Sequence, residues 1–296
     1  MAEPSIFILG VQKCGTTTVA DLLAAQPEIF LPSIKETYFF CDESRYAKGD
    51  DWYRSEFYAR GATQGSTRFC DATPFYLASR EALERIERYA GDEGRFVVCL
   101  RDPVQRAYSA YWHQRRLGNE TLPFAEALAA EPLRIAEGRA AKGRWWRHAY
   151  VEVGMYGKHL EHAFQVLGRE RFLVLNETDL ADMRALQARL RAFLGLPECQ
   201  DVPNVKRSNS SAMPRSRWVQ AAIIRNSALK RVIQAVLPRE FRSRIGRTIR
   251  EINQRAFRYP PMEEETRIAL RQTFSQDRTR LRSLKIPVPE SWQANG

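Results

Sequence analysis

The sequence has little cysteine, little histidine and no long hydrophobic run. Its five cysteines lie far apart without paired spacing, so we expect reduced thiols rather than a disulfide framework. Its four histidines include one close pair, His159 and His162, but no third ligand at a useful spacing, so we expect no metal site. No stretch of about 18 apolar residues occurs, which argues against a transmembrane span. Because the first predicted strand begins close to Met1, we expect no signal peptide and a cytoplasmic protein.

The length and the apolar pattern indicate one α/β domain. A chain of 296 residues with an ordinary apolar share can bury a sizeable core, and we expect a single domain over 1–296. Short apolar runs alternate with helical patterns, which is typical of a parallel sheet flanked by helices. The strands that we predict are 5–9, 65–69, 95–100 and 171–175.

The first predicted strand leads directly into a glycine-rich loop, which reads GVQKCGTTT at 10–18. Its two glycines keep the spacing of a nucleotide-triphosphate phosphate loop, but Thr16 stands where that loop has its lysine, and Lys13 lies inside the loop. A strand, a tight turn and a helix N-terminus expose backbone N–H groups that can bind a phosphate or a sulfate, and the hydroxyls of Thr16 and Thr17 could add to them. An ordinary connection between a strand and a helix is the alternative.

A second candidate anion site follows the strand predicted at 95–100. Arg101 comes directly after this strand, and ligands of open parallel sheets bind at the carboxyl ends of the strands, where a guanidinium can hold two phosphate oxygens. Pro103 suits the first turn of a helix, and Ser109 follows about two turns later, so its hydroxyl could reach the same phosphate. The alternatives are a salt bridge from Arg101 to Asp102 or another acid, and a solvated Ser109.

Three segments in this order resemble the sulfotransferases that use 3′-phosphoadenylyl sulfate (PAPS), most of all their heparan-sulfate and bacterial branch. The segments are the loop at 10–18, KETYFF at 35–40 and LRDPVQRAYSAY at 100–111. Weaker similarity in the connecting segments extends the resemblance over 5–217. The resemblance to this family implies a P-loop-like parallel sheet flanked by helices, with a donor-binding core over 5–217 inside the single domain.

The resemblance also implies which residues bind the donor. Arg101 and Ser109 correspond to the residues that bind its 3′-phosphate. A late polar loop would close over the same end of the nucleotide, with Lys206, Arg215 and Arg217 as candidate contacts; a surface loop is the alternative. The 5′-phosphosulfate would be held by the loop residues Lys13, Cys14, Gly15, Thr16, Thr17 and Thr18.

Sulfuryl transfer needs a base for the acceptor hydroxyl and a cation near the departing phosphate oxygen. By the resemblance, Glu36 is the base and Lys13 is the cation, although a solvent-facing Lys13 is the alternative. The aromatic residues at 38–40 are expected to desolvate Glu36 and raise its pKa, whereas pairing with Lys35 would hold that pKa down.

The sequence departs from the family where many relatives carry a lysine before Thr-Pro, because this chain has Ala72 there. A second catalytic cation must therefore come from elsewhere or be missing. Asp71 could act as a base or bind the acceptor, but a capping or turn role near Thr73 is an equal alternative. The acceptor-binding candidates in the arginine-rich run at 143–148, which could instead pack into the core, are Trp145, Trp146 and His148.

The net charge of +11 is concentrated late in the chain. The segment 225–259, within a basic helical C-terminal region at 218–296, interleaves arginines with apolar residues and predicts basic amphipathic helices. Such helices could rest on an anionic membrane or hold an acidic acceptor. Packing on the sheet with solvated arginines is the favoured alternative.

Together these patterns predict a PAPS-dependent sulfotransferase that releases adenosine 3′,5′-bisphosphate (PAP) and uses no metal. The acceptor would be a hydroxyl on a glycan, a lipid or a small natural product, and no nucleic acid is expected as a partner. Contact with a membrane surface and the oligomeric state stay open. Two other classes remain: a nucleotide kinase with an aberrant phosphate loop, which predicts magnesium dependence, and a non-catalytic module that binds polyanions or membranes, which predicts salt-dependent binding.

Overall fold

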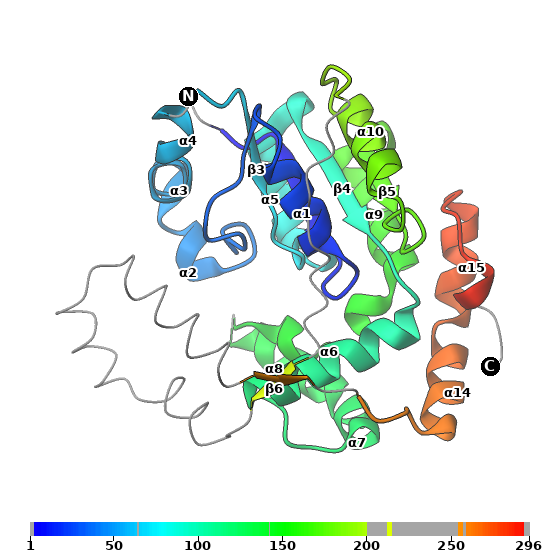
Figure 1. Cartoon of the computed structure of the whole chain (residues 1–296). Helices are drawn as coiled ribbons and strands as arrows, with labels where there is room; N and C mark the ends of the chain where they lie inside the picture. The colour runs from blue at the N-terminus through cyan, green and yellow to red at the C-terminus, as the bar shows by residue number, and fades with distance from the viewer. Residues whose placement is uncertain are drawn as a thin grey trace.

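A computed structural model describes residues 3–63, 65–141, 143–199, 212–214, 254–256 and 259–292. Its centre is a parallel sheet with the strand order β2-β3-β1-β4-β5 (Figure 1). A short antiparallel pair, formed by β6 (Ala212–Pro214) and β7 (Gln254–Ala256), lies apart from it. The strands of the central sheet are β1 (Ile6–Gly10), β2 (Ile29–Phe30), β3 (Arg68–Asp71), β4 (Arg95–Cys99) and β5 (Phe172–Leu175).

The central strand β1 is buried along its whole length and pairs in parallel with β3 on one side and β4 on the other. Its register places Ile6 beside Cys70 of β3 and beside Arg95 of β4. A strand buried on both faces reads as a continuous apolar run, which is why the run at 6–9 identifies it. The phosphate loop therefore leaves the middle of the sheet, where it has neighbours on both sides.

Helices cover the sheet and its carboxyl edge. In Figure 1, α1 crosses in front of the strands, whereas α6 and α8 lie beneath their carboxyl ends. The helices before β5 are α1 (Thr16–Ala24), α2 (Glu43–Tyr46), α3 (Gly49–Phe57), α4 (Ala59–Thr63), α5 (Arg80–Ala90), α6 (Pro103–Leu117), α7 (Phe124–Ala129), α8 (Glu131–Ala140) and α9 (Tyr156–Leu167). Those after it are α10 (Met183–Phe193), α14 (Glu264–Thr273) and α15 (Ser275–Ser283).

The C-terminal helices belong to the same packed body. Asp277 of α15 accepts hydrogen bonds from the backbone N–H groups of Gly157 and Lys158 at 2.8 and 2.9 Å. It thereby satisfies two N–H groups that open α9 and have no partner within that helix. A Cβ at Gly157 would lie 2.7 Å from the Asp277 carbonyl oxygen, so this approach requires glycine. Figure 1 shows α14 and α15 along the side of the molecule that carries β5.

The predicted α/β class and parallel sheet are confirmed, with shifts at the strand ends. β3 begins at Arg68 rather than at 65, because Gly65 adopts a left-handed turn with φ 75°. The helix predicted after the loop is α1, in which Val19, Leu22 and Leu23 are buried as expected. β2 was missed because a two-residue strand is too short to leave a periodic pattern.

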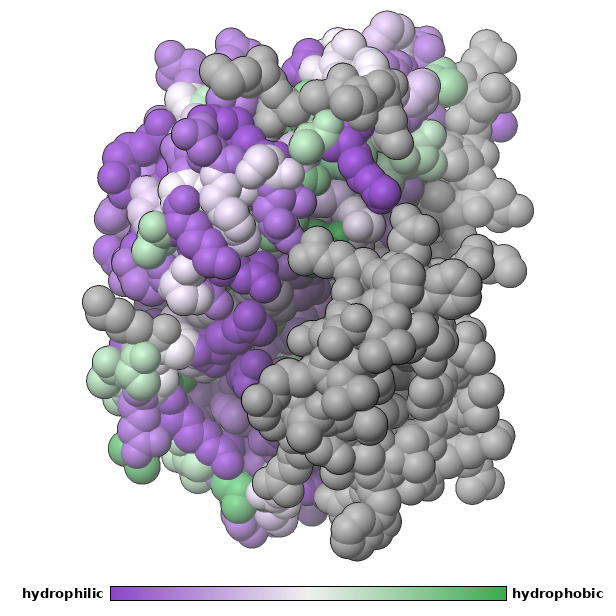
Figure 2. All heavy atoms as spheres, turned by 90° about the vertical axis from the view of Figure 1, so that its left-hand side faces the viewer, coloured by the Kyte–Doolittle hydropathy of each residue, from purple (hydrophilic) through white to green (hydrophobic). Residues whose placement is uncertain are grey.

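The predictions about membrane spans, cysteines and the C-terminal segment are tested only on the described residues. Among the described residues, no helix combines the length and the apolarity that a bilayer span requires. All five cysteines are free, as expected. On the face turned to the viewer in Figure 2, hydrophilic side chains cover most of the described surface and hydrophobic ones are scattered. Of the segment 225–259, where basic helices are expected, the structure describes 254–256, which form strand β7 rather than a helix, and Tyr259. The other residues of that segment lie outside the described ones, and the single domain over 1–296 stays a prediction.

Candidate active site

A cleft of about 540 Å³ opens at the carboxyl edge of the sheet, where β1 and β4 end. It brings together the phosphate loop, the start of α6 and the segment that carries Glu36. Of the residues predicted to bind the donor or catalyse transfer, those on its wall are Lys13, Cys14, Gly15, Thr16, Thr17, Thr18, Glu36, Arg101 and Ser109. The two phosphate-site motifs and the candidate base, which are far apart in sequence, therefore share one cavity.

The phosphate loop has the geometry of an anion cradle. β1 ends at Gly10 and α1 begins at Thr16, so the N–H groups of Thr16 and Thr17 have no carbonyl partner within the helix. Gly15 caps α1 with φ 89°, and a Cβ there would lie 2.3 Å from Leu180 Cδ1. The backbone conformation favours glycine, and a Cβ would also force the end of the Leu180 side chain to move. The positive end of α1 consequently faces the cleft with its donors available.

Lys13 lies half-buried in the loop in a left-handed conformation, with φ 71°. Burial, followed by the charges of the Arg116 and Arg101 guanidinium groups, lowers its pKa from 10.5 to about 8. A cluster of cations that repel one another and lose solvation is the pattern expected of a site that binds an anion. This placement does not fit a solvent-facing loop lysine.

Cys14, beside Lys13, is 2 % exposed, and its thiol lies 3.5 Å from the Tyr156 hydroxyl. Burial raises the pKa of this thiol to about 11, so it remains protonated and unreactive near neutral pH. The thiol therefore acts as a small buried filler of the loop. Any donor contact at this position comes from its backbone.

One face of α6 forms the second half of the cleft. Ser109, His113 and Arg116 follow one another at intervals of four and three residues, so they lie on one side of the helix, and all three line the cavity. Asp102 caps this helix by accepting from the Val104 N–H at 2.9 Å, and Arg101 precedes it. The helical spacing from Ser109 is the sequence signal that places His113 and Arg116 on the same side of α6.

Neighbouring charges determine the ion pairing of Arg101 and the protonation of His113 on this side of the cleft. Arg101 is paired with Glu177, Nε to Oε2, at 3.6 Å, so the predicted alternative of an ion pair occurs together with its position in the cleft. Burial, followed by the charges of Lys13 and Arg116, lowers the pKa of His113 to about 3. His113 is therefore neutral near pH 7, when it can both donate and accept a hydrogen bond.

Glu36 lines the cleft, half-buried, and accepts a hydrogen bond from the Tyr38 hydroxyl. Lys35 does not pair with it: its ammonium donates to Thr17 Oγ1 at 3.1 Å. The expected desolvation by 38–40 needs correction for two of the three rings. Phe39 and Phe40 are fully buried and pack against Tyr53 in the core, because hydrophobic packing there outweighs contact with a carboxylate.

Asp71 is not placed to act as a base or to contact an acceptor. It is 0 % exposed at the end of β3 and does not line the cleft. Its carboxylate accepts hydrogen bonds from four hydroxyls, those of Thr37 at 2.6 Å, Tyr53 at 2.7 Å, Thr73 at 2.7 Å and Tyr76 at 3.0 Å. The alternative of a turn role near Thr73 fits this structure. Burial raises the pKa of Asp71 even though all four donors oppose that shift.

Trp145, Trp146 and His148 also lie outside the wall of the cleft. Trp146 is 5 % exposed and stacks on Tyr38 with ring centroids 6.0 Å apart, so it supports the ring that holds Glu36. His148 lies 3.0 Å, through Nε2, from the Asn119 carbonyl oxygen. The core alternative therefore holds for Trp146, because an indole recovers more free energy in the aromatic core than on the surface.

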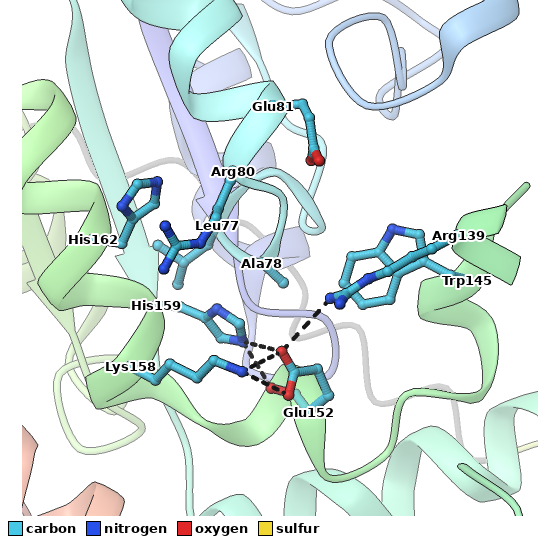
Figure 3. A pocket seen from close by; sticks show the side chains of 10 residues that line it. All are labelled: Leu77, Ala78, Arg80, Glu81, Arg139, Trp145, Glu152, Lys158, His159 and His162. Atoms are coloured by element: carbon cyan, nitrogen blue, oxygen red, sulfur yellow. Dashed lines mark hydrogen bonds and ion pairs between the residues drawn. The ribbon is translucent and has the colours of Figure 1, made fainter. Parts of the chain in front are cut away.

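Trp145 instead borders a second, smaller cavity of about 190 Å³ (Figure 3). Figure 3 shows Glu152 at its base between three cationic or titratable side chains. The Lys158 ammonium lies 2.8 Å from the Glu152 carboxylate, and Arg139 and His159 approach it at 3.8 Å. Arg139 also lies over the Trp145 ring at 4.4 Å. Lys158 and Arg139 thus both approach the same carboxylate, that of Glu152.

Some predictions about the site fall on parts of the chain that the structure describes little. Lys206, Arg215 and Arg217 lie outside the described residues. After them Tyr259 lines the cleft and stacks on Trp112 of α6 with ring centroids 5.6 Å apart. Across the described segments, no three His, Cys, Asp or Glu side chains are grouped so that they could hold a metal ion.

Fold and cleft together define an α/β protein whose glycine-rich loop carries Lys13 and differs from the nucleotide-triphosphate type. The chain belongs to the sulfotransferase family, because the profile of the sulfotransferase domain matches residues 3–227. The family prediction from the three sequence motifs is confirmed.

Curated relatives agree with this assignment. Human heparan sulfate glucosamine 3-O-sulfotransferase 3B1 is 30% identical over 194 residues, which cover 65% of this chain and 46% of the relative. The human 3-O-sulfotransferase 6 is 31% identical over 194 residues, 65% of this chain and 52% of the relative. The chain thus spans about half the length of the curated relatives that it matches. A crystal structure of a sulfotransferase from Alicyclobacillus acidocaldarius shares the fold, with a TM-score of 0.71 and 24% identity over 99% of this chain and 100% of that one.

Proposed function

We propose that this protein transfers the sulfuryl group of PAPS to the hydroxyl of an acceptor. The observation that carries the proposal is the single cleft that joins the phosphate loop, Arg101 with Ser109, and Glu36. PAPS has a phosphosulfate at one end and a 3′-phosphate at the other, so it needs two anion sites along one cavity. Family membership supports the same donor.

The donor would lie along the cleft between the loop and α6. The 5′-phosphosulfate would be held by the α1 N-terminus, by Lys13 and by the hydroxyls of Thr16 and Thr17. The 3′-phosphate would be held by the Arg101 guanidinium and the Ser109 hydroxyl. Contacts from Lys206, Arg215 and Arg217 belong to the same proposal.

Transfer would proceed by in-line displacement at sulfur. The acceptor oxygen forms a bond to sulfur while the bond from sulfur to the phosphate oxygen breaks. Glu36 takes the proton of the acceptor hydroxyl, and the electron pair of the broken bond stays on the phosphate of PAP. Lys13 stabilises that developing charge, or gives it a proton. Tyr38, which donates to Glu36, keeps the carboxylate aimed into the cleft.

The acceptor belongs to the class of hydroxyl compounds that includes glycans, lipids and small natural products. The curated relatives are named for glucosamine in heparan sulfate, so heparan sulfate is the acceptor to test first. A cytoplasmic location and contact with a membrane through 225–259 stay predictions.

Binding of PAP tests the donor site without knowledge of the acceptor. We expect calorimetric titration to show tight, metal-independent binding of PAP, with far weaker binding of ADP and of ATP with magnesium. Arg101→Ala is expected to weaken PAP binding by about 10-fold or more, since it removes a charged contact to the 3′-phosphate. The matched control is Arg95→Ala, because the Arg95 side chain donates to the Asp92 and Gly94 carbonyls and does not line the cleft.

Two other results would redirect the assignment. Preference for ATP with magnesium would favour the kinase alternative. Binding of none of the three nucleotides, together with salt-dependent binding of heparan sulfate, would favour the polyanion module. An Arg101→Ala variant that binds PAP as tightly as the wild-type protein would remove Arg101 from the donor site.

The pKa of Lys13 predicts how donor binding depends on pH. Its pKa of about 8 means that Lys13 loses its charge as the pH rises through 8. A bound anion favours the protonated form, so PAP binding should take up protons and weaken by up to about 10-fold between about pH 7 and pH 9.5. Titrations in buffers of different ionisation enthalpy measure both effects. Lys13→Met should bind PAP more weakly with little pH dependence, and a variant that retains the wild-type slope would exclude Lys13 as its source.

A further inference from the structure

Lys35 lies at the edge of the cleft, where it contacts one lining residue, Thr17, and is adjacent in sequence to another, Glu36. It precedes Glu36 in the chain, and its ammonium donates to Thr17 Oγ1 at 3.1 Å. Thr17 is the exposed residue in the first turn of α1, and both Thr17 and Glu36 line the cleft. Lys35 therefore holds a positive charge where the phosphate loop meets the candidate base.

The ammonium is placed to make further contacts. It has three N–H donors, and Thr17 is the hydrogen-bond partner that the described part of the chain provides. Burial lowers its pKa, whereas the carboxylates of Glu36 and Asp21 oppose that shift. A partly desolvated ammonium that keeps unused donors gains from an additional anionic oxygen.

The neighbouring strand end supplies no cation of its own. Ala72 follows Asp71 at the end of β3, is 1 % exposed and ends in a methyl group. Lys13, Arg101 and Arg116 gather on the loop and α6 sides of the cleft, where their charges affect one another. On the side of Glu36, Arg45 and Arg144 lie against the Tyr38 ring, whereas Lys35 is the cation that contacts the phosphate loop.

We propose that Lys35 binds an oxygen of the sulfuryl group that is being transferred and supplies the second cation of the site. The inference rests on the proposed function, because it takes the phosphate loop as the site of the phosphosulfate. Thr17 positions the ammonium, which donates to a sulfuryl oxygen with one of its remaining N–H groups. Lys13 acts at the departing phosphate oxygen, so the two lysines contact different oxygens of the same displacement.

This arrangement predicts that the Lys35 side chain contributes to the binding of PAPS but not to the binding of PAP. Negative charge on the sulfuryl oxygens is present in PAPS and absent from PAP, because PAP has lost the whole sulfuryl group. A residue that contacts only that group must therefore distinguish the two nucleotides. A residue that merely holds Thr17 and the loop in place would affect both equally.

The test compares PAP with PAPS on Lys35→Met, Lys35→Arg and the wild-type protein. We expect Lys35→Met to bind PAP within about 2-fold of the wild-type protein and PAPS about 10-fold more weakly. The release of PAP from PAPS is measured with heparan sulfate as acceptor and without an acceptor. Lys35→Met should lower the rate by about 10²-fold in one or both of these assays. Lys35→Arg should recover part of that loss. The matched control is Lys48→Met, which removes an exposed lysine beside Trp52 and should change none of these values.

The outcomes separate the inference from the function on which it rests. Equal weakening of PAP and PAPS by Lys35→Met would overturn the sulfuryl contact and leave a structural role for Lys35. Wild-type affinity for PAPS together with a wild-type rate in this variant would also overturn it. Failure of the wild-type protein to bind either nucleotide would instead overturn the proposed function.

Discussion

Replacement of Glu36 by glutamine is expected to reduce sulfuryl transfer by about 10²- to 10⁴-fold and to leave PAP binding within about 2-fold of the wild-type value. Glutamine has the size of glutamate and keeps an oxygen that can accept from the Tyr38 hydroxyl. It cannot take a proton from an acceptor hydroxyl. The loss should therefore appear in the rate of transfer and not in the affinity for the nucleotide.

Steady-state transfer from PAPS to an acceptor that the wild-type protein sulfates, together with calorimetry of PAP, measures both quantities. The matched control is Glu56→Gln, since Glu56 is an exposed glutamate of α3 that does not line the cleft. Turnover by Glu36→Gln at close to the wild-type rate would show that Glu36 is not the base. The neutral imidazole of His113, which also lines the cleft, would then be the first residue to examine.

Replacement of Asp71 by alanine is expected to lower the free energy of unfolding by about 3 kcal/mol or more. The carboxylate is fully buried and accepts from the hydroxyls of Thr37, Tyr53, Thr73 and Tyr76. Without it, four buried hydroxyls lose a charged acceptor at once, and the contacts of Thr37 with Tyr76 at 2.9 Å and of Tyr53 with Tyr58 at 3.3 Å replace only part of that loss.

The same change should also impair transfer in the protein that remains folded. Asp71 holds Thr37, the residue between Glu36 and Tyr38, and Thr73, whose hydroxyl lies 3.3 Å from the Tyr38 N–H. Asp71 is thus a positioning residue for the segment that presents the base. Its loss should lower the rate of transfer more than it lowers the affinity for PAP.

Urea unfolding followed by fluorescence and circular dichroism measures the stability of this variant. Asp71→Asn retains one acceptor oxygen and the size of the side chain, so it should lose less stability than Asp71→Ala. The comparison variant is Asp182→Ala, which removes the exposed cap of α10 and should cost about 1 kcal/mol. An Asp71→Ala variant no less stable than Asp182→Ala would show that the network around Asp71 contributes little.

Several parts of the site could be predicted because they depend on local backbone chemistry. The apolar run at 6–9 and the glycines at 10 and 15 indicate a strand, a tight turn and a helix start, and the structure has all three. Pro103 opens α6 as expected, and Ser109 lies on that helix. Arg101 lies between the end of β4 at Cys99 and the start of α6. These features follow from rules that act within about ten residues.

Other parts depend on contacts between distant segments. Asp71 has the residue type of a catalytic acid, but parallel pairing of β3 with β1 and β2 buries it beneath hydroxyls from 37, 53, 73 and 76. Trp146 is of a residue type that can stack on a sugar, but its ring packs on Tyr38 and Phe75. The type of a residue does not by itself reveal which hydroxyl or ring its side chain will contact across the core.

The sequence by itself determined the sulfotransferase family, the α/β class and the glycine-rich loop between β1 and α1, since each depends on contiguous residues whose backbone preferences are strong. Only the tertiary structure decided which side chains share the cleft. It moved Asp71, Trp145, Trp146 and His148 away from the cavity, and it brought His113 and Arg116 to the cavity and Lys35 to Thr17 at its edge. The physical reason is that burial and charge pairing are properties of the assembled core and depend on elements that are far apart along the chain.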